Sequence, residues 1–126
     1  MNEELLRQDL IRDEDRRLKP YRCTAGKLSI GVGRNLDDVG ISRSEAEYML
    51  HNDILNVQID LDKNLPWWRK MSDTRQLVLA NMAFNLGIAG VLEFHEMLRY
   101  LQAGDYLGAA REMLDSLWAK QVGGRA

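Results

Sequence analysis

The sequence has a single cysteine, Cys23, so no disulfide bond can form within the chain, which suits folding in a reducing cytoplasm. A secretory signal peptide is also absent, because residues 2–17 (NEELLRQDLIRDEDRR) are charged throughout and lack an apolar segment. No stretch approaches the roughly eighteen apolar residues that a membrane-spanning helix requires. These absences predict synthesis in the cytoplasm and no stable membrane insertion.

A strong net charge is missing as well, since the formal charge at pH 7 is −2. Basic residues cluster between Arg12 and Arg34, where seven Lys/Arg face three acids, and residues 37–62 carry seven acids against Arg43 alone. A locally basic surface could favour an anionic polymer, although ordinary solvated faces explain the pattern more simply. No nucleic acid partner is expected.

Length and composition predict one soluble globular domain covering residues 1–126. The chain is 45% apolar and 29% charged, and a domain of this size buries roughly two thirds of its unfolded surface. It therefore needs neither a disulfide nor a metal to fold. The two histidines, His51 and His95, lie in separate predicted helices without ligand spacing, so we expect no metal and no cofactor.

Helical patterns dominate the chain. Asn2 is a plausible N-cap for a helix over about 3–13 that carries an apolar stripe of leucines. Ser42 and Glu45 have the spacing of a capping box, in which hydroxyl and carboxylate satisfy each other's backbone donors. This box predicts a long helix that runs to about residue 63, before Pro66.

The second half is predicted to be helical throughout. Trp67 and Trp68 could form a sugar platform, but in a loop between helices they more often cover the core. Residues 77–86 (LVLANMAFNL) are apolar almost all round, which predicts a helix buried on every side. Shorter helices are predicted over about 92–101 and 105–117.

Residues 19–33 (KPYRCTAGKLSIGVG) break the helical pattern. A turn flanked by stretches rich in β-forming residues predicts a small hairpin. Gly31 and Gly33 form a G-x-G pair, but the third glycine and the following helix of a nucleotide-binding loop are missing. The glycines are better explained by a bend or a close approach of backbone.

Three reactive groups stand close together in this opening stretch: Glu14 at the predicted helix end, Cys23 and Ser29. A carboxylic acid held partly away from water can keep its proton near neutral pH and donate it to a leaving oxygen, as glycosidases require. The ordinary alternative is a solvated helix end beside a small buried cysteine. The spacing allows both interpretations.

These residues resemble the active-site segment of the phage-type lysozymes, glycoside hydrolase family 24. The family pattern is Glu, eight residues, Asp or Cys, five residues, Thr, and this sequence reads Glu14, Cys23, Ser29. The likeness continues through ISRSEAEYML, NMAFNLG and the ending SLWAKQVGGRA, so it covers essentially the whole chain.

The resemblance implies a mainly helical α+β fold with two lobes. A small antiparallel sheet would lie in an N-terminal lobe of about residues 14–60, and a long helix would connect it to a C-terminal lobe of about 64–126 plus the helix 1–13. The implied activity is hydrolysis of the β-1,4 bond between N-acetylmuramic acid and N-acetylglucosamine in bacterial peptidoglycan. Such an endolysin would lyse the host cell.

The resemblance also implies roles for single residues. Glu14 would donate the proton, Cys23 would take the place of the second catalytic residue, and Ser29 would stand beside the attacking water. The residues expected to bind substrate are Gly33, Phe84, Asn85, Leu86 and Arg125. The protein would be made in the host cytoplasm and reach the wall after release through a holin.

The sequence departs from the family in three ways. Cys23 is neutral unless ionised, so the mechanism stays open between a thiolate and a water held by Ser29. Serine in place of threonine lacks the methyl group that fixes the rotamer. The chain also ends at Ala126, where family members usually continue, so we expect a monomer that self-associates if apolar surface is left uncovered.

Two alternatives to hydrolysis follow from these departures. The first is a module that keeps the fold and binds peptidoglycan, but has lost turnover through Cys23, Ser29 or the short C-terminus. A lytic transglycosylase, which needs only one acid, is the second.

Overall fold

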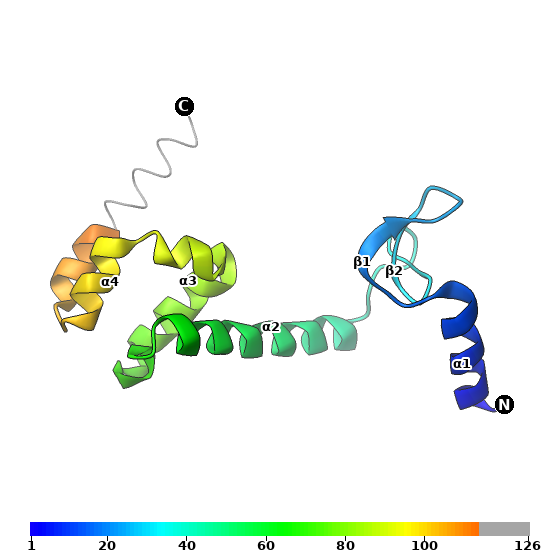
Figure 1. The fold of residues 1–126 in the computed structure, drawn as a ribbon, viewed down its shortest axis with the longest axis horizontal. Helices are drawn as coiled ribbons and strands as arrows, with labels where there is room; N and C mark the ends of the chain where they lie inside the picture. The colour runs from blue at the N-terminus through cyan, green and yellow to red at the C-terminus, as the bar shows by residue number, and fades with distance from the viewer. Residues whose placement is uncertain (114–126) are drawn as a thin grey trace. The chain divides into compact units, whose positions relative to one another are not determined.

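A computed structural model describes residues 1–113, so the predicted end of the last helix and Arg125 lie outside the described residues. Contacts divide the chain into two compact units, residues 1–48 and 49–126. Helices make up most of the second unit, while the first combines one helix and the start of another with one small antiparallel sheet (Figure 1). The predicted mainly helical α+β class is thereby confirmed, whereas the predicted lobe boundaries stay a prediction.

The first unit begins with helix α1, Glu3–Glu14, close to the predicted range. The Asn2 side chain caps it by accepting a hydrogen bond from the Leu5 backbone N–H at 3.1 Å. No residue of α1 is buried, and its leucine stripe is exposed. The helix therefore owes its boundary to capping rather than to packing within this unit.

The predicted hairpin is present and gains a third short strand. Strands β1 (Arg17–Arg22), β2 (Leu28–Gly31) and β3 (Arg34–Asn35) pair antiparallel in that order. Tyr21 lies opposite Ser29, and the register shifts between Arg17 and Tyr21. This irregularity lies in the part of β1 that follows directly after α1.

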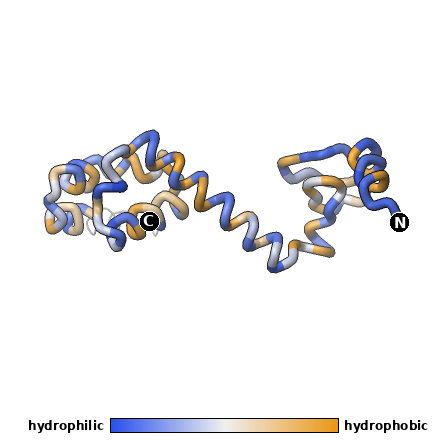
Figure 2. The backbone as a smooth tube through the Cα atoms, turned by 90° about the horizontal axis from the view of Figure 1, so that it is seen from below, coloured by the Kyte–Doolittle hydropathy of each residue, from blue (hydrophilic) through white to orange (hydrophobic). Residues whose placement is uncertain are grey.

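Helix α2, Arg43–Asn64, starts in the first unit and continues in the second. The capping box is formed as predicted, since the Glu45 backbone N–H donates to Ser42 Oγ at 3.1 Å and the Ser42 N–H donates to Glu45 Oε1 at 2.9 Å. Hydrophobic and hydrophilic residues alternate along the helix (Figure 2). Leu61, near its end, is fully buried.

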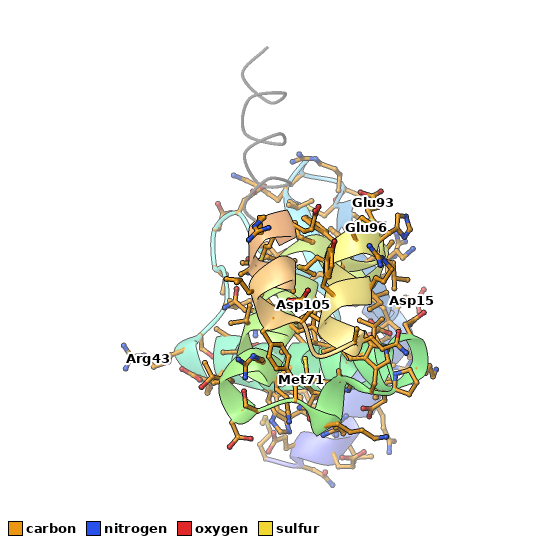
Figure 3. The ribbon with its side chains drawn as sticks, turned by 90° about the vertical axis from the view of Figure 1, so that its left-hand side faces the viewer. Asp15, Arg43, Met71, Glu93, Glu96 and Asp105 are labelled. Carbon is orange, nitrogen blue, oxygen red and sulfur yellow. The ribbon has the colours of Figure 1, made fainter. Side chains whose placement is uncertain are left out.

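The second unit holds the hydrophobic core. It contains the 3₁₀ turn η1 (Trp68–Lys70), helix α3 (Asp73–Leu92), helix α4 (His95–Gln102) and a helical stretch from residue 106 to the end of the described chain. Asp105, labelled in Figure 3, caps that last stretch by accepting from the Gly108 N–H at 2.9 Å. The core side chains come from all of these elements and from α2: Leu61, Leu65, Trp68, Met71, Leu79, Ala83, Val91, Phe94, Met97, Leu98 and Ala109.

The tryptophan pair covers this core, as predicted for tryptophans in a loop between two helices. Trp68 is only 3% exposed, and its ring N–H donates to Asp62 Oδ1 at 2.7 Å. Trp67 is partly buried against the same cluster. The buried ring and its satisfied N–H leave Trp68 no face for a sugar.

The prediction that α3 is buried on every side is wrong. Only Leu79, Ala83 and Val91 are buried, whereas Leu77 is 70% exposed and Phe84 is 46% exposed. The reason is that α3 turns one face to the core while another lines an open groove along α2. By length and composition α3 is long and apolar enough to cross a membrane, and it has a kink at Gly87.

Candidate active site

Glu14 is the last residue of α1, in the middle of three consecutive acids. Its two neighbours are engaged: Asp13 Oδ1 pairs with Arg12 Nε at 3.3 Å, and Asp15 Oδ1 accepts from the Arg16 N–H at 2.8 Å. The Glu14 carboxylate forms no hydrogen bond or ion pair with any residue of the described chain. Of the three acids it is the one left available to a substrate.

The backbone turns sharply after Glu14. Asp15 has φ 64° and ψ 161°, a combination that is almost restricted to glycine, and it is the one non-glycine residue with positive φ in the described part of the chain. Its N–H still closes the helix by donating to the Ile11 carbonyl at 3.0 Å. This strained residue therefore turns the backbone from the end of α1 toward β1, which begins two residues later.

Gly33 forms the wall against which the Glu14 side chain lies. A Cβ placed on Gly33 would come within 3.2 Å of Glu14 Oε2 and 3.4 Å of its carboxyl carbon. Gly33 also has φ +72°, which side-chain-bearing residues rarely adopt. Gly33 was predicted to bind substrate, and here its missing side chain makes room for the catalytic candidate.

Cys23 and Ser29 lie together at the end of the hairpin. The Cys23 N–H donates to the Lys27 carbonyl at 2.9 Å, and the Gly26 N–H donates to the Cys23 carbonyl at 2.8 Å, which closes the turn. Ser29 is 2% exposed, and its hydroxyl donates to the same Lys27 carbonyl at 3.3 Å. The structure thus brings the second and third predicted catalytic residues into one small cluster.

This cluster favours the ionised thiol. Backbone N–H groups of Lys27 and Ala25 lower the pKa of Cys23 most, and the Ser29 hydroxyl adds to the shift, while partial burial opposes it. The surroundings of reactive cysteines in other proteins also lower the pKa of the thiol by stabilising the thiolate. A lowered pKa makes the thiolate a better candidate for a catalytic role than the sequence suggested.

The surroundings of Glu14 within the first unit are open. The sequence allowed either a carboxyl held partly away from water or a solvated helix end, and within this unit Glu14 is exposed. The reason is that α1 buries none of its residues, so its C-terminal end is open. The residues of the first unit fix where the carboxyl lies without shielding it.

The other predicted substrate-binding residues lie on α3 in the second unit. Phe84 lines a groove of about 590 Å³ between α2 and α3, together with Leu50, Ile54 and Leu77. The Asn85 amide donates to the Asn81 carbonyl at 2.9 Å and to Asn81 Oδ1 at 2.8 Å, so it is used within the helix.

Leu86 is 39% exposed, and Arg125 lies outside the described residues. Whether these α3 residues and Arg125 bind substrate stays a prediction.

The sequence did not predict an ion pair that lies next to the site. Arg34, directly after Gly33, forms two bonds with Glu45, Nη1 to Oε1 at 2.9 Å and Nη2 to Oε2 at 2.8 Å. Its Nη1 also donates to the Gly40 carbonyl at 3.1 Å. The capping-box motif singled out Glu45. A separation of eleven residues in the sequence, however, does not indicate that the Arg34 and Glu45 side chains are bonded.

Comparison with known proteins supplies the context for this geometry. The sequence profile of the family described as "Phage lysozyme" matches residues 12–126. Among curated proteins, the chain is 31% identical to an endolysin of Acyrthosiphon pisum secondary endosymbiont phage 1, over 86% of this chain and 73% of that protein. It is 34% identical to the SAR-endolysin of Escherichia phage Mu, over 88% of this chain and 65% of that protein.

The chain is also similar to a much longer protein. It is 32% identical to the pre-baseplate central spike protein Gp5 of Enterobacteria phage T4, over 93% of this chain but 25% of the spike protein. The chain thus spans a quarter of that relative. Similar sequences occur both as separate endolysins and within a structural phage protein.

Proposed function

The chain belongs to the phage lysozyme family, and on this basis we propose that it hydrolyses the β-1,4 bond between N-acetylmuramic acid and N-acetylglucosamine in bacterial peptidoglycan. The observation that carries the proposal is the position of the Glu14 carboxylate, which ends α1, lies against Gly33 and has no polar partner among residues 1–113. A carboxyl group placed beside the scissile bond is the kind of side chain that serves as a general acid in glycoside cleavage. Family membership supplies the reaction, and Glu14 supplies the acid.

In this proposal Glu14 protonates the glycosidic oxygen as the bond to the leaving sugar breaks. Positive charge then develops on the sugar ring, and a second group must stabilise it or deliver a nucleophile. Cys23 is the group that this chain offers, because its lowered pKa favours the anionic form. The buried Ser29 hydroxyl contributes to the lowering of the Cys23 pKa, after the backbone groups of Lys27 and Ala25.

The first test replaces the acid. Wild-type protein is expected to clear a suspension of chloroform-treated Gram-negative cells, and Glu14→Gln is expected to lose about a hundredfold or more of that rate, the usual range for removing a general acid. Asp13→Asn is the matched control, because it removes a neighbouring acid that is already paired with Arg12. Equal clearing by wild type and Glu14→Gln would remove Glu14 from the mechanism.

The second test addresses the thiol. If the thiolate acts chemically, Cys23→Asp keeps a negative charge and retains activity, while Cys23→Ala loses most of it. If alanine is as active as cysteine, the thiol has no chemical role and a water beside Ser29 becomes the better explanation. Both variants keep Glu14 intact, so they separate the two halves of the mechanism.

The nature of the product separates hydrolysis from transglycosylation. Mass spectrometry of the released muropeptides shows reducing ends if water is the acceptor and anhydro-sugars if the muramic acid hydroxyl is the acceptor. We expect reducing ends, because the proposed pairing of an acid with a nucleophile or base is that of a hydrolase.

A structural or wall-binding module is the second candidate, and the likeness to the T4 spike protein favours it. Such a module would sediment with purified peptidoglycan but leave turbidity and muropeptides unchanged. Binding without clearing by the wild-type protein would support this alternative. Clearing by the wild type and not by Glu14→Gln supports the hydrolase.

The site of action follows from the substrate. Relatives named endolysins support a role in releasing phage from the host, so we propose synthesis in the host cytoplasm and access to the wall through a holin. The prediction is that cells producing the protein alone stay turbid and that chloroform or a co-expressed holin causes rapid lysis. Lysis without either agent would show that the protein reaches the wall by itself.

A further inference from the structure

The arginine and glutamate beside the site suggest a role that neither the family pattern nor the capping box assigns. Gly33 forms the wall against the Glu14 side chain, so any movement of Gly33 moves the support of the catalytic carboxyl. Its own backbone is poorly restrained, because Gly31 and Gly33 both have positive φ and glycine moves easily between conformations. Something else must hold this loop in place.

Strand β3 is too short to do so alone. It consists of Arg34 and Asn35, and only two residue pairs, Ile30 with Arg34 and Ser29 with Asn35, join it to β2. A two-residue edge strand makes few ladder hydrogen bonds and frays easily. The side chain of Arg34 adds what the strand lacks.

That side chain is fixed at three points. Both of its terminal nitrogens bond to the Glu45 carboxylate, and Nη1 also donates to the Gly40 carbonyl. Glu45 is fixed in turn by the Ser42 N–H at 2.9 Å and by its place in the first turn of α2. A planar guanidinium bound by two parallel bonds is held in orientation as well as in position.

We infer that the Arg34–Glu45 pair is a positioning device that anchors Gly33 to the start of α2 and thereby holds the Glu14 carboxyl where a substrate can meet it. Arg34 and Glu45 touch neither substrate nor proton in this scheme and act through Gly33. The inference rests on the proposed function, in which Glu14 is the acid. Both side chains are about two fifths exposed, so loss of the pair is expected to lower global stability without unfolding the protein.

The test compares Arg34→Gln and Glu45→Gln with Arg99→Gln. The control removes a similar two-bond pair, Arg99 with Glu96, in the second unit. We expect each pair variant to lose between about tenfold and a hundredfold of turnover at nearly unchanged KM, since misplacing a catalytic group by about 1 Å has costs of this size. The double variant should lose no more than either single one, and Arg34→Lys should keep more turnover than Arg34→Gln.

A second measurement does not depend on catalysis. The backbone amide order parameter of Gly33, measured by ¹⁵N relaxation, should fall in both pair variants and stay at the wild-type value in Arg99→Gln. If the wild type proves inactive, the proposed function fails, and this measurement still decides whether the pair holds Gly33. An unchanged Gly33 order parameter, or full turnover in both folded pair variants, would overturn the inference.

Discussion

At the scale of single residues, three neighbouring acidic side chains have different surroundings. Asp13 is paired, Asp15 is bonded to the next backbone N–H, and Glu14 is left open on Gly33. The side chains differ little in intrinsic acidity, so their partners decide what each can do. The availability of Glu14 is a property of its surroundings and not of its residue type.

Cys23 offers a residue-scale prediction about pH. Because backbone donors lower its pKa, the reactive thiolate persists to lower pH in the folded protein than in the unfolded chain. The rate of iodoacetamide alkylation should therefore reach half its maximum at a lower pH in native protein than in protein unfolded by guanidinium. Ser29→Ala should move the native midpoint only slightly upward, since the backbone donors contribute more. Coinciding native and unfolded midpoints would contradict the prediction.

Asp15 carries a second prediction at this scale. Its backbone conformation, φ 64° and ψ 161°, costs a side-chain-bearing residue about 1–3 kcal/mol, and glycine avoids most of that cost. Asp15→Gly should thus be more stable than Asp15→Ala by about 1–2 kcal/mol, even though alanine is normally preferred to glycine. Urea unfolding of the two variants measures the difference, and alanine being the more stable of the two would show that the residue is unstrained.

At the scale of elements, the hydrogen bonds at the start of α2 both cap this helix and connect it to strand β3. The helix begins with a capping box whose glutamate also binds Arg34, so one carboxylate caps the start of a helix and restrains strand β3. This double use explains why Glu45 has the most strongly shifted acid pKa in the described chain, about 2. The hydrogen bond with Arg34 is the largest cause of the shift, followed by the Ser42 N–H.

The Glu45 shift predicts a dependence of stability on pH. Because the folded pKa, about 2, lies below the ordinary value of 4.5, the carboxylate stabilises the folded protein fully above about pH 4.5. That contribution is lost as the pH falls toward 2. The difference in unfolding free energy between wild type and Glu45→Gln should be constant from pH 5 to 7 and shrink below pH 4.5. A difference that grows on acidification would contradict the assigned shift.

Helix α3 shows how two faces of one apolar helix differ. Leu79 is 1% exposed in the core, whereas Leu77 is 70% exposed. Leu79→Ala should cost about 3 kcal/mol through lost burial and a cavity, and Leu77→Ala should change stability by less than about 0.5 kcal/mol. The same substitution in the same helix cancels any difference in helix propensity. Denaturant unfolding measures both, and equal losses would show that the two faces are equally buried.

At the scale of the whole molecule, the two units have different roles. The second unit contains all residues of the main hydrophobic core, while the first buries Ser29 and no large apolar side chain completely. Stability is therefore concentrated in the second unit, and the candidate chemistry of Glu14, Cys23 and Ser29 is concentrated in the first. In enzymes, catalytic residues often lie in regions of low local stability, outside the main hydrophobic core.

Much of this arrangement was predictable from the sequence. The first helix, the capping box, the hairpin and the long second helix were all confirmed, because capping residues, turn residues and apolar spacing act over a few positions. The burial of α3 was predicted wrongly, because an apolar helix does not reveal which of its faces finds a partner.

The sequence by itself determined the helices, the hairpin, the family and the identity of the candidate acid, thiol and hydroxyl. Only the tertiary structure decided that Glu14 lies against Gly33, that Lys27 and Ser29 lie beside Cys23, and that Arg34 is bound to Glu45. The physical reason is the separation along the chain of the residues that interact. Secondary structure follows from interactions between near neighbours in the chain, whereas the partners of a charged or catalytic group are set by folding, which brings distant residues within a few ångströms.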